Sequence, residues 1–219
     1  MATMRTYGDG CGIAHALDLV GERWALLVVR ELLLGPKRFT DLKDGLPNAS
    51  PNVLTQRLRE LGEAGIVRRR KLPPPAGSWI YELTDWGRDL KPIVLSLGTW
   101  ALRSPSRLDD APVGTDSVIL ALATFFDAGA AGDLDARYEL RMGENTFAVR
   151  IAGGAIDVDR GAAPDADATI ESDAETLSAL IWERRDLGDA LRAGDIAIDG
   201  DKAAVSRFLA LFPPPRPAG

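Results

Sequence analysis

The sequence predicts an α+β protein of two domains, and three observations lead to this prediction. Hydrophobic spacing is helical over most of residues 11–65, alternates as in strands over 66–83, and then becomes helical again. Residues 1–107 hold 16 basic and 11 acidic side chains, a net charge of +5, whereas residues 108–219 hold 10 and 21, a net of −11. The stretch "RSPSRLDDAPVG" between them is rich in Pro, Ser and charge, as linkers are. We therefore expect a first domain over 1–104, a linker over 105–115, a second domain over 116–212 and a Pro-rich tail over 213–219.

The bulk composition favours a protein without metal, cofactor or membrane span. A chain of 219 residues with 46% hydrophobic residues is long enough for two ordinary cores. One cysteine and one histidine exclude an intramolecular disulfide and argue against a zinc site. No apolar run near the N-terminus reaches the length of a signal peptide or a membrane span. We expect a cytoplasmic protein.

Three helices are predicted in the first 65 residues. The first is expected as one helix from Ile13 to Leu34, because its apolar residues recur at helical spacing until Gly35-Pro36 stops it. A short second helix covers "FTDLKDGLP", residues 39–47. The third begins after Ser50, a good N-cap followed by a proline at the first helical position.

The third helix is predicted to be amphipathic. Leu54, Leu58 and Leu61 recur at i, i+4 and i+7 and are expected to be buried. The opposite face is polar and is expected to be exposed; it consists of Asn52, Thr55, Gln56, Arg57 and Arg59.

A basic hairpin follows the third helix. "GIVRRRKL" and "SWIYELT" are typical of strands, and "PPPAG" between them predicts a proline-stiffened tip. The first strand places Arg68, Arg69, Arg70 and Lys71 in a row. A further helix is expected from Thr84, bent near Pro92.

Three helices, a basic hairpin and a helix are the order of a winged helix-turn-helix. In that fold the third helix enters a major groove and the hairpin, or wing, lies against phosphates or in the minor groove. Clustered cations neutralise phosphates, and short or forked polar side chains suit base edges. The alternative is a solvated basic face on an ordinary helical domain. The DNA-binding candidates are Ser50, Asn52, Thr55, Gln56, Arg57, Arg59, Arg68, Arg69, Arg70 and Lys71.

This half of the chain also resembles a known family. "CGIAHALDLVGERWALLVVRELLLGPKRFTDLKDGLP", "LTQRLRELGEAGIVRRR" and "YELTDWGRDLKPIVLSLGTW" are similar to the HxlR family of bacterial winged-helix regulators, over about residues 11–102. The resemblance implies a homodimer, built on the first and last helices, that binds inverted-repeat operator DNA. The segment 49–52, "ASPN", departs from the family's usual opening of the recognition helix, so the operator sequence is not implied.

Two lone residues lie at the start of the first helix. Cys11 directly precedes it, where the helix dipole would lower the thiol pKa. Some members of the HxlR family sense electrophiles or oxidants through a cysteine at this place, so Cys11 is a redox candidate; otherwise it is a small buried residue. His15 is expected to be a core or interface side chain.

The second half predicts an antiparallel sheet covered by helices. An apolar helix over 116–128 precedes three alternating strands, over 137–142, 146–152 and 155–161. A strand over 168–172, a helix capped by Ser172 or Asp173, a helix over 187–194, a strand over 195–201 and a closing helix over 202–212 follow. No catalytic constellation is visible, so the protein is not expected to be an enzyme.

The second half resembles the sterol carrier protein family of lipid-binding domains. "FAVRIAGGAIDVDRGAAPDADATIESDAETLSALIWER" and "LRAGDIAIDGDKAAVSRFLALF" support this, over roughly residues 117–212. The resemblance implies an apolar tunnel that holds a fatty acyl, sterol or other hydrophobic molecule. The alternative is that the same side chains fill a dry core. The candidate lining residues are Phe125, Phe126, Ile181, Trp182, Phe208 and Phe212.

The sequence therefore predicts a homodimeric transcriptional regulator. Its first domain would bind double-stranded operator DNA, and its second would bind a hydrophobic effector (a fatty acyl, sterol or aromatic compound) that alters DNA affinity. One alternative is a lipid carrier that uses the helical domain only to dimerise. The other is a regulator that senses thiol oxidation through Cys11.

Overall fold

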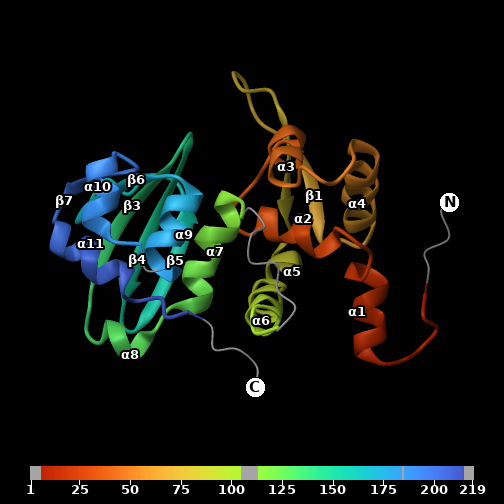
Figure 1. Ribbon diagram of the computed structural model, residues 1–219. Coiled ribbons are helices and arrows are strands. Elements are labelled where there is room, and N and C mark those ends of the chain that lie inside the picture. Colours follow the sequence, from red (N-terminus) through yellow and green to blue (C-terminus); the bar gives the residue numbers. More distant parts are fainter. Residues whose placement is uncertain (1–5, 105–112, 184, 215–219) are drawn as a thin grey trace. The chain divides into compact units, whose positions relative to one another are not determined.

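The computed structural model describes residues 6–104, 113–183 and 185–214. The chain divides into two compact units, Met1–Val94 and Leu95–Gly219, and each is described by itself (Figure 1). Most of the expected linker, residues 105–112, and most of the expected tail, residues 215–219, lie outside the described residues.

The first half of the chain has the expected winged-helix order, with one more break than expected. Its helices and strands are α1 (Gly12–Val20), α2 (Ala25–Leu32), α3 (Phe39–Gly45), α4 (Pro51–Glu63), β1 (Val67–Lys71), β2 (Trp79–Leu83), α5 (Asp85–Arg88) and α6 (Lys91–Ala101). The predicted bend near Pro92 is the break between α5 and α6, and Thr84 is the N-cap of α5, where its Oγ1 accepts a hydrogen bond from the Gly87 N–H.

The prediction of one helix from Ile13 to Leu34 is wrong. α1 ends at Val20, and Trp24, the N-cap of α2, has left-handed backbone angles with φ at +78°. The prediction failed because apolar residues keep helical spacing from Ile13 to Leu34, on both sides of this break. The two pieces have different roles, since α2 buries five residues in the domain core whereas α1 buries none.

The core of the first unit lies between α2, α3, α4 and the hairpin. It is apolar and contains Ala25, Val28, Val29, Leu32, Leu42, Leu46, Ala49, Leu54, Leu58, Leu61, Ile66, Val67 and Leu83. Leu54, Leu58 and Leu61 are buried, as predicted from their spacing. This packing holds α4 as one rigid element with its other face directed outward.

Both ends of α4 are defined by the local sequence. The Ser50 hydroxyl accepts a hydrogen bond from the Val53 N–H at 3.3 Å, and Pro51 is the first helical residue, as predicted. At the other end Gly65 has φ at +73°, its N–H donates to the Gly62 carbonyl, and the Ile66 N–H donates to the Leu61 carbonyl. This is a Schellman ending, which turns the chain directly into β1.

The second unit has one five-stranded sheet in the order β5-β4-β3-β6-β7. Its strands are β3 (Ala136–Met142), β4 (Asn145–Ala152), β5 (Ala155–Arg160), β6 (Ala168–Ser172) and β7 (Ile196–Gly200). Its helices after α6 are α7 (Thr115–Phe125), α8 (Ala128–Ala131), α9 (Ala174–Trp182), α10 (Leu187–Ala193) and α11 (Lys202–Leu209). Of the two cap candidates for α9, Asp173 is the N-cap; its carboxylate accepts from the Thr176 N–H at 2.6 Å.

The expectation of a fully antiparallel sheet is wrong. β3 and β6 pair in parallel, with Tyr138 opposite Ala168 and Met142 opposite Ser172, whereas the other pairs are antiparallel. The cause is the segment 161–167, which returns from β5 across two strands to the free edge of β3. Alternation shows which face of a strand is buried but does not show which strand is its neighbour.

The two faces of this sheet differ in chemistry. Tyr138, Leu140 and Phe147 are fully buried on the face covered by helices, and the ring of Tyr138 lies 4.6 Å from that of Phe208 on α11. The opposite face is charged; it includes Arg137, Glu139, Arg141, Arg150, Asp157 and Asp159.

Candidate nucleic-acid interface

The exposed face of α4 presents polar side chains suited to base edges. Asn52, Thr55, Gln56 and Arg59 are exposed, as is the N-cap Ser50. Two of them make internal hydrogen bonds: the Thr55 hydroxyl donates to the Pro51 carbonyl at 2.8 Å, and the Gln56 amide donates to Glu60 at 2.9 Å. Both bonds are local and exposed, so either side chain can exchange its partner for a base edge without loss of packing.

Arg57 does not belong to this exposed face, contrary to the prediction. Its side chain is only 10% exposed. Its guanidinium pairs with Glu60 one turn along α4 and with Glu22, whose Oε2 lies 3.4 Å from Nη2. Its guanidinium thus links α4 to the segment between α1 and α2 through Glu22, and the expectation that the side chain is exposed is wrong.

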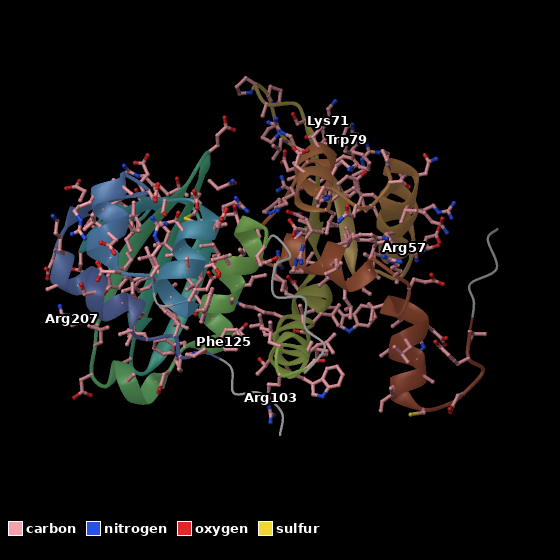
Figure 2. All side chains as sticks on the ribbon, in the orientation of Figure 1. Arg57, Lys71, Trp79, Arg103, Phe125 and Arg207 are labelled. Atoms are coloured by element: carbon pink, nitrogen blue, oxygen red, sulfur yellow. The ribbon has the colours of Figure 1, made fainter. Side chains whose placement is uncertain are left out.

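The wing is the antiparallel hairpin of β1 and β2, joined at its outer edge by a bridge between Lys37 and Tyr81. Arg68 and Arg70 donate to Glu82, at 2.7 Å and 3.1 Å. The other two cations of the run, Arg69 and Lys71, lie over the ring of Trp79, at 4.3 Å and 6.0 Å from its centroid. Figure 2 shows Lys71 and Trp79 together on the hairpin and Arg57 apart on α4.

Sequence reasoning missed Trp79 and Glu82. The sequence predicts both only as strand residues, because the alternation of one strand does not show which cation faces which neighbour. The signal that could have found them is the hairpin register, which places Trp79 opposite Lys71 and Glu82 opposite Arg68. Glu82 is 8% exposed, and its pKa is lowered, first by the hydrogen bond from Arg70 and then by Arg68.

A buried ion cluster supports the helices beneath the wing. Glu31 is 2% exposed, and its carboxylate accepts from Lys37 at 2.5 Å and from Arg30 at 2.7 Å. A methyl group added at Gly45 would come within 2.2 Å of Glu31 Oε2. Gly45 is the last residue of α3 and Glu31 lies in α2, so the two helices pack closely at this point.

Cys11 is an exposed free cysteine at the N-cap of α1, so it is not a buried residue. The nearby backbone N–H groups of Ile13 and Ala14 lower the pKa of its thiol. This is the direction expected at a helix N-terminus. His15, expected in the core or an interface, is exposed within this chain.

The ligand candidates of the second unit fall into two groups. Phe208 and Phe212 are buried with their rings 5.0 Å apart, and the ring of Phe208 also packs against Tyr138, as in a packed core. Phe125 and Trp182 are half-buried, with ring centroids 6.0 Å apart, between α7 and α9. The indole N–H of Trp182 is buried and has no hydrogen-bond partner among the residues that the structure describes. Of the remaining two, Ile181 is buried and Phe126 is half-buried with its ring 6.3 Å from Phe212.

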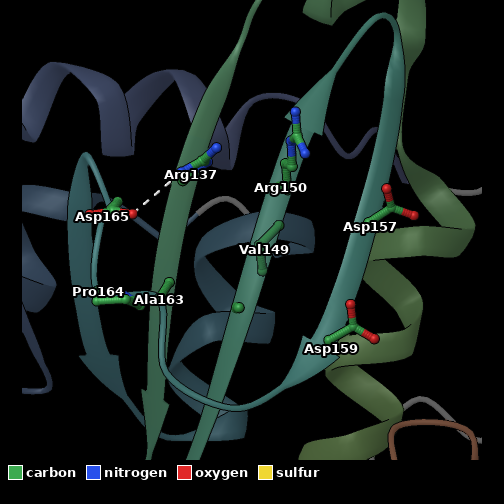
Figure 3. A pocket seen from close by; sticks show the side chains of 9 residues that line it. Arg137, Val149, Arg150, Asp157, Asp159, Ala163, Pro164 and Asp165 are labelled. Carbon is green, nitrogen blue, oxygen red and sulfur yellow. Dashed lines mark ion pairs between the residues drawn. The ribbon is translucent and has the colours of Figure 1, made fainter.

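A pocket of about 340 Å³ lies on the charged face of the sheet (Figure 3). Arg137 and Arg150 face each other from β3 and β4, and Arg137 pairs with Asp165 at 3.7 Å. Asp157 and Asp159 of β5 complete its polar lining, and Ala148, Val149, Ala163 and Pro164 complete the rest. This pocket lies on the other face from the helices, so it is not the apolar tunnel expected from the sequence.

The described residues show neither a metal-ligand group nor a membrane-spanning helix. No group of three or more His, Cys, Asp or Glu side chains there is arranged to hold a metal ion. None of the helices within 6–104, 113–183 and 185–214 is long and apolar enough to cross a membrane.

The helix α4 with its exposed polar face, supported by a core and flanked by a basic wing, defines a winged helix-turn-helix DNA-binding protein. The model of HxlR-like helix-turn-helix proteins matches residues 19–107. The transcriptional regulator YvaP of Bacillus subtilis is 41% identical over 96 residues, which are 43% of this chain and 89% of YvaP. The chain belongs to the HxlR-like helix-turn-helix family and is a DNA-binding transcriptional regulator.

Solved structures resemble each half separately. The redox regulator HypR in its oxidized form is 32% identical and covers 44% of this chain and 100% of its own, with a TM-score of 0.42. The alkyl sulfatase C-terminal model matches residues 112–218. A double mutant of the sec-alkyl sulfatase PisA1 is 25% identical over 42% of this chain and 15% of its own, with a TM-score of 0.39. The family matched in the second half is thus named for alkyl sulfatases, and the sterol carrier resemblance stays a prediction.

Proposed function

We propose that this regulator binds an inverted-repeat operator as a homodimer, with α4 in the major groove and the wing against the backbone. The observation that supports this most is the exposed set Asn52, Thr55 and Gln56 on a helix whose other face is locked in the core. In a two-fold dimer, two such helices would face two half-sites about one helical turn apart.

Operator selection from random duplexes tests the role of α4. The expected result is a palindromic consensus, with Gln56→Ala relaxing one position in each half-site at a cost of about 1–3 kcal/mol. Arg59→Ala should weaken binding to all sequences alike, because an exposed cation of this kind contacts phosphate. A parent protein that selects no sequence would contradict operator binding.

Exposed apolar side chains on α1 and α6 support the homodimer. Neither helix buries a residue in this chain, although each has strongly apolar positions. Ile13 and Trp100 are both 73% exposed. Exposed apolar residues clustered on two helices are typical of a protein interface.

We further propose that the second unit binds a hydrophobic effector. The buried N–H of Trp182 has no partner within the described part of the chain and lies next to the half-buried ring of Phe125. This supports the proposal, since such a donor among aromatic rings can bind the polar group of an amphipathic ligand. Fatty acyl, sterol and aromatic compounds remain the proposed classes.

Ligand binding is measured on the full chain with a fluorescent fatty acid and a fluorescent sterol. The chain has five tryptophans, so Trp182→Phe identifies the ligand-dependent part of the emission. A sensor must also couple reciprocally to DNA, typically by about 1–3 kcal/mol. A ligand that binds without altering operator affinity would favour a carrier or dimerisation role for this unit, and absence of any binding would favour a dry core.

Thiol oxidation at Cys11 is a second proposed signal, because the thiol is exposed and its pKa is lowered. Since the chain has one cysteine, diamide would take two electrons from two Cys11 thiolates and join two copies by a disulfide. Cys11→Ser should bind DNA as the parent does but lose the diamide response. An equal response in both proteins would remove Cys11 from the mechanism.

A cytoplasmic location of this regulator stays a prediction.

A further inference from the structure

The four consecutive cations of the wing are divided between its two faces. Side chains alternate along a strand, so Arg68 and Arg70 project from one face of the hairpin and Arg69 and Lys71 from the other. The register places Glu82 directly opposite Arg68, and Tyr81 and Trp79 opposite Arg69 and Lys71. One face thus meets a carboxylate and the other meets aromatic rings.

On the first face, one carboxylate engages two guanidiniums. Arg70 donates from Nε and Nη2 to the two oxygens of Glu82, each at 3.1 Å, and Arg68 donates from Nε at 2.7 Å. The Glu82 carboxylate is buried, whereas the side chains of Arg68 and Arg70 are 58% and 45% exposed, so only the acceptor end of these charge-assisted bonds is shielded from water. To bind Arg70, a DNA phosphate would have to displace Glu82 from a bidentate ion pair that is already formed.

On the second face, the cations contact aromatic rings and no carboxylate of the described residues. The Arg69 guanidinium lies 4.3 Å from the centroid of Trp79 and 5.9 Å from that of Tyr81. Neither Arg69 nor Lys71 forms an ion pair within the described part of the chain. A ring attracts a cation through its quadrupole without neutralising it, and stacking limits the rotamers of the long side chain. Trp79 itself is 48% exposed, so this arrangement lies at the surface.

We propose that Arg69 and Lys71 are the wing residues that bind DNA phosphates, that Trp79 positions Arg69 for this interaction, and that Glu82 withholds Arg68 and Arg70 from it. The inference rests on the DNA-binding role of the wing. It does not depend on which operator α4 selects, because phosphate binding is independent of sequence.

The salt dependence of binding reports how many phosphates the wing neutralises. The probe is a mixed-sequence 30-base-pair duplex. The slope of log K against log salt is negative, and its absolute value, called the slope below, falls by about 0.9 for each phosphate that is no longer neutralised. Arg69→Gln with Lys71→Gln should lower the slope by about 1.8. The matched double variant Arg68→Gln with Arg70→Gln removes the same charge and should change the slope by less than about 0.5, which is about half the effect of one phosphate.

Two further variants guard against misfolding and test Glu82 directly. If the Arg68/Arg70 variant unfolds because Glu82 loses its partners, the triple variant Arg68→Gln, Arg70→Gln and Glu82→Gln replaces it and should leave the slope unchanged. Glu82→Gln alone should steepen the slope, because it releases two cations for phosphate. Circular dichroism of each variant confirms that the fold is retained.

A double-mutant cycle tests Trp79 as a positioning residue. Trp79→Leu should weaken binding by about two- to fivefold in the parent, the range expected for an exposed cation–π interaction. It should have no effect when Arg69→Gln and Lys71→Gln are already present, since the ring then has no cation to position. An equal loss in both backgrounds would mean that Trp79 touches DNA itself and would overturn its assigned role.

Equal slope changes for the two matched double variants would overturn the division of the wing. A parent protein that does not bind the duplex even at low salt would instead contradict the DNA-binding role itself. The two failures are therefore distinguishable in one series of titrations.

Discussion

The guanidinium of Arg57 on α4 lies 3.4 Å from the carboxylate of Glu22, in the segment that separates α1 from α2. A residue whose spacing predicts an exposed base contact is therefore part of the support of the recognition helix. The pair ties α4 to the segment between the end of α1 and the start of α2.

Arg57→Ala should lower the free energy of unfolding by about 1–3 kcal/mol, because Glu60 and Glu22 lose a charged hydrogen-bond partner and the side chain leaves a gap. Urea unfolding measures this. The matched control is Arg59→Ala, an exposed arginine of the same helix, with an expected change within about 0.5 kcal/mol. The bases preferred by the Arg57→Ala protein should be those of the parent protein. A changed consensus would show that Arg57 does contact a base.

Gly45→Ala should destabilise the first unit by about 1–3 kcal/mol through overpacking. The added methyl group would meet Glu31 Oε2 at 2.2 Å, and that carboxylate is held by Lys37 and Arg30. Gly62→Ala is the control, because its methyl group would meet only the Val67 carbonyl at 3.7 Å. Gly62 lies in the last turn of α4, so that change should stabilise by at most about 0.5–1 kcal/mol. Similar melting temperatures for the two variants would show that Glu31 moves aside freely.

The stability of the wing should depend on pH through Glu82, whose pKa is lowered by Arg70 and Arg68. Because its folded-state pKa is below its unfolded-state value, the carboxylate stabilises the fold above the ordinary glutamate pKa of about 4.3. That contribution is lost as pH falls from there through the lower folded-state pKa. Melting curves of the parent and Glu82→Gln should therefore converge as pH is lowered from about 6 to about 3, and a constant separation would contradict this.

Trp100→Glu should convert the proposed dimer to a monomer, since it places a charge in the exposed apolar surface of α6. Light scattering after gel filtration measures the mass. Trp86→Glu is the control, because Trp86 is also exposed but lies on α5. A parent that is already monomeric, or a Trp100→Glu protein that remains dimeric, would exclude an interface at this residue.

Much of the fold follows from local chemistry and could be predicted from the sequence alone. Ser50-Pro51 begins α4 and the leucine spacing buries it, because capping and helical periodicity act within a few residues. The hairpin, the Thr84 cap and the five strands of the second unit follow from the sequence for the same reason.

Tertiary structure decided which neighbour each side chain meets. The parallel pairing of β3 with β6 depends on where segment 161–167 crosses, and no local pattern encodes that path. Arg57 and Glu22 are far apart in the sequence, and Glu82 is 14 positions from Arg68, yet these interactions determine which arginines are held by a carboxylate. Charge and hydrophobic spacing are properties of one segment, whereas the partner of a charge depends on how distant segments pack together.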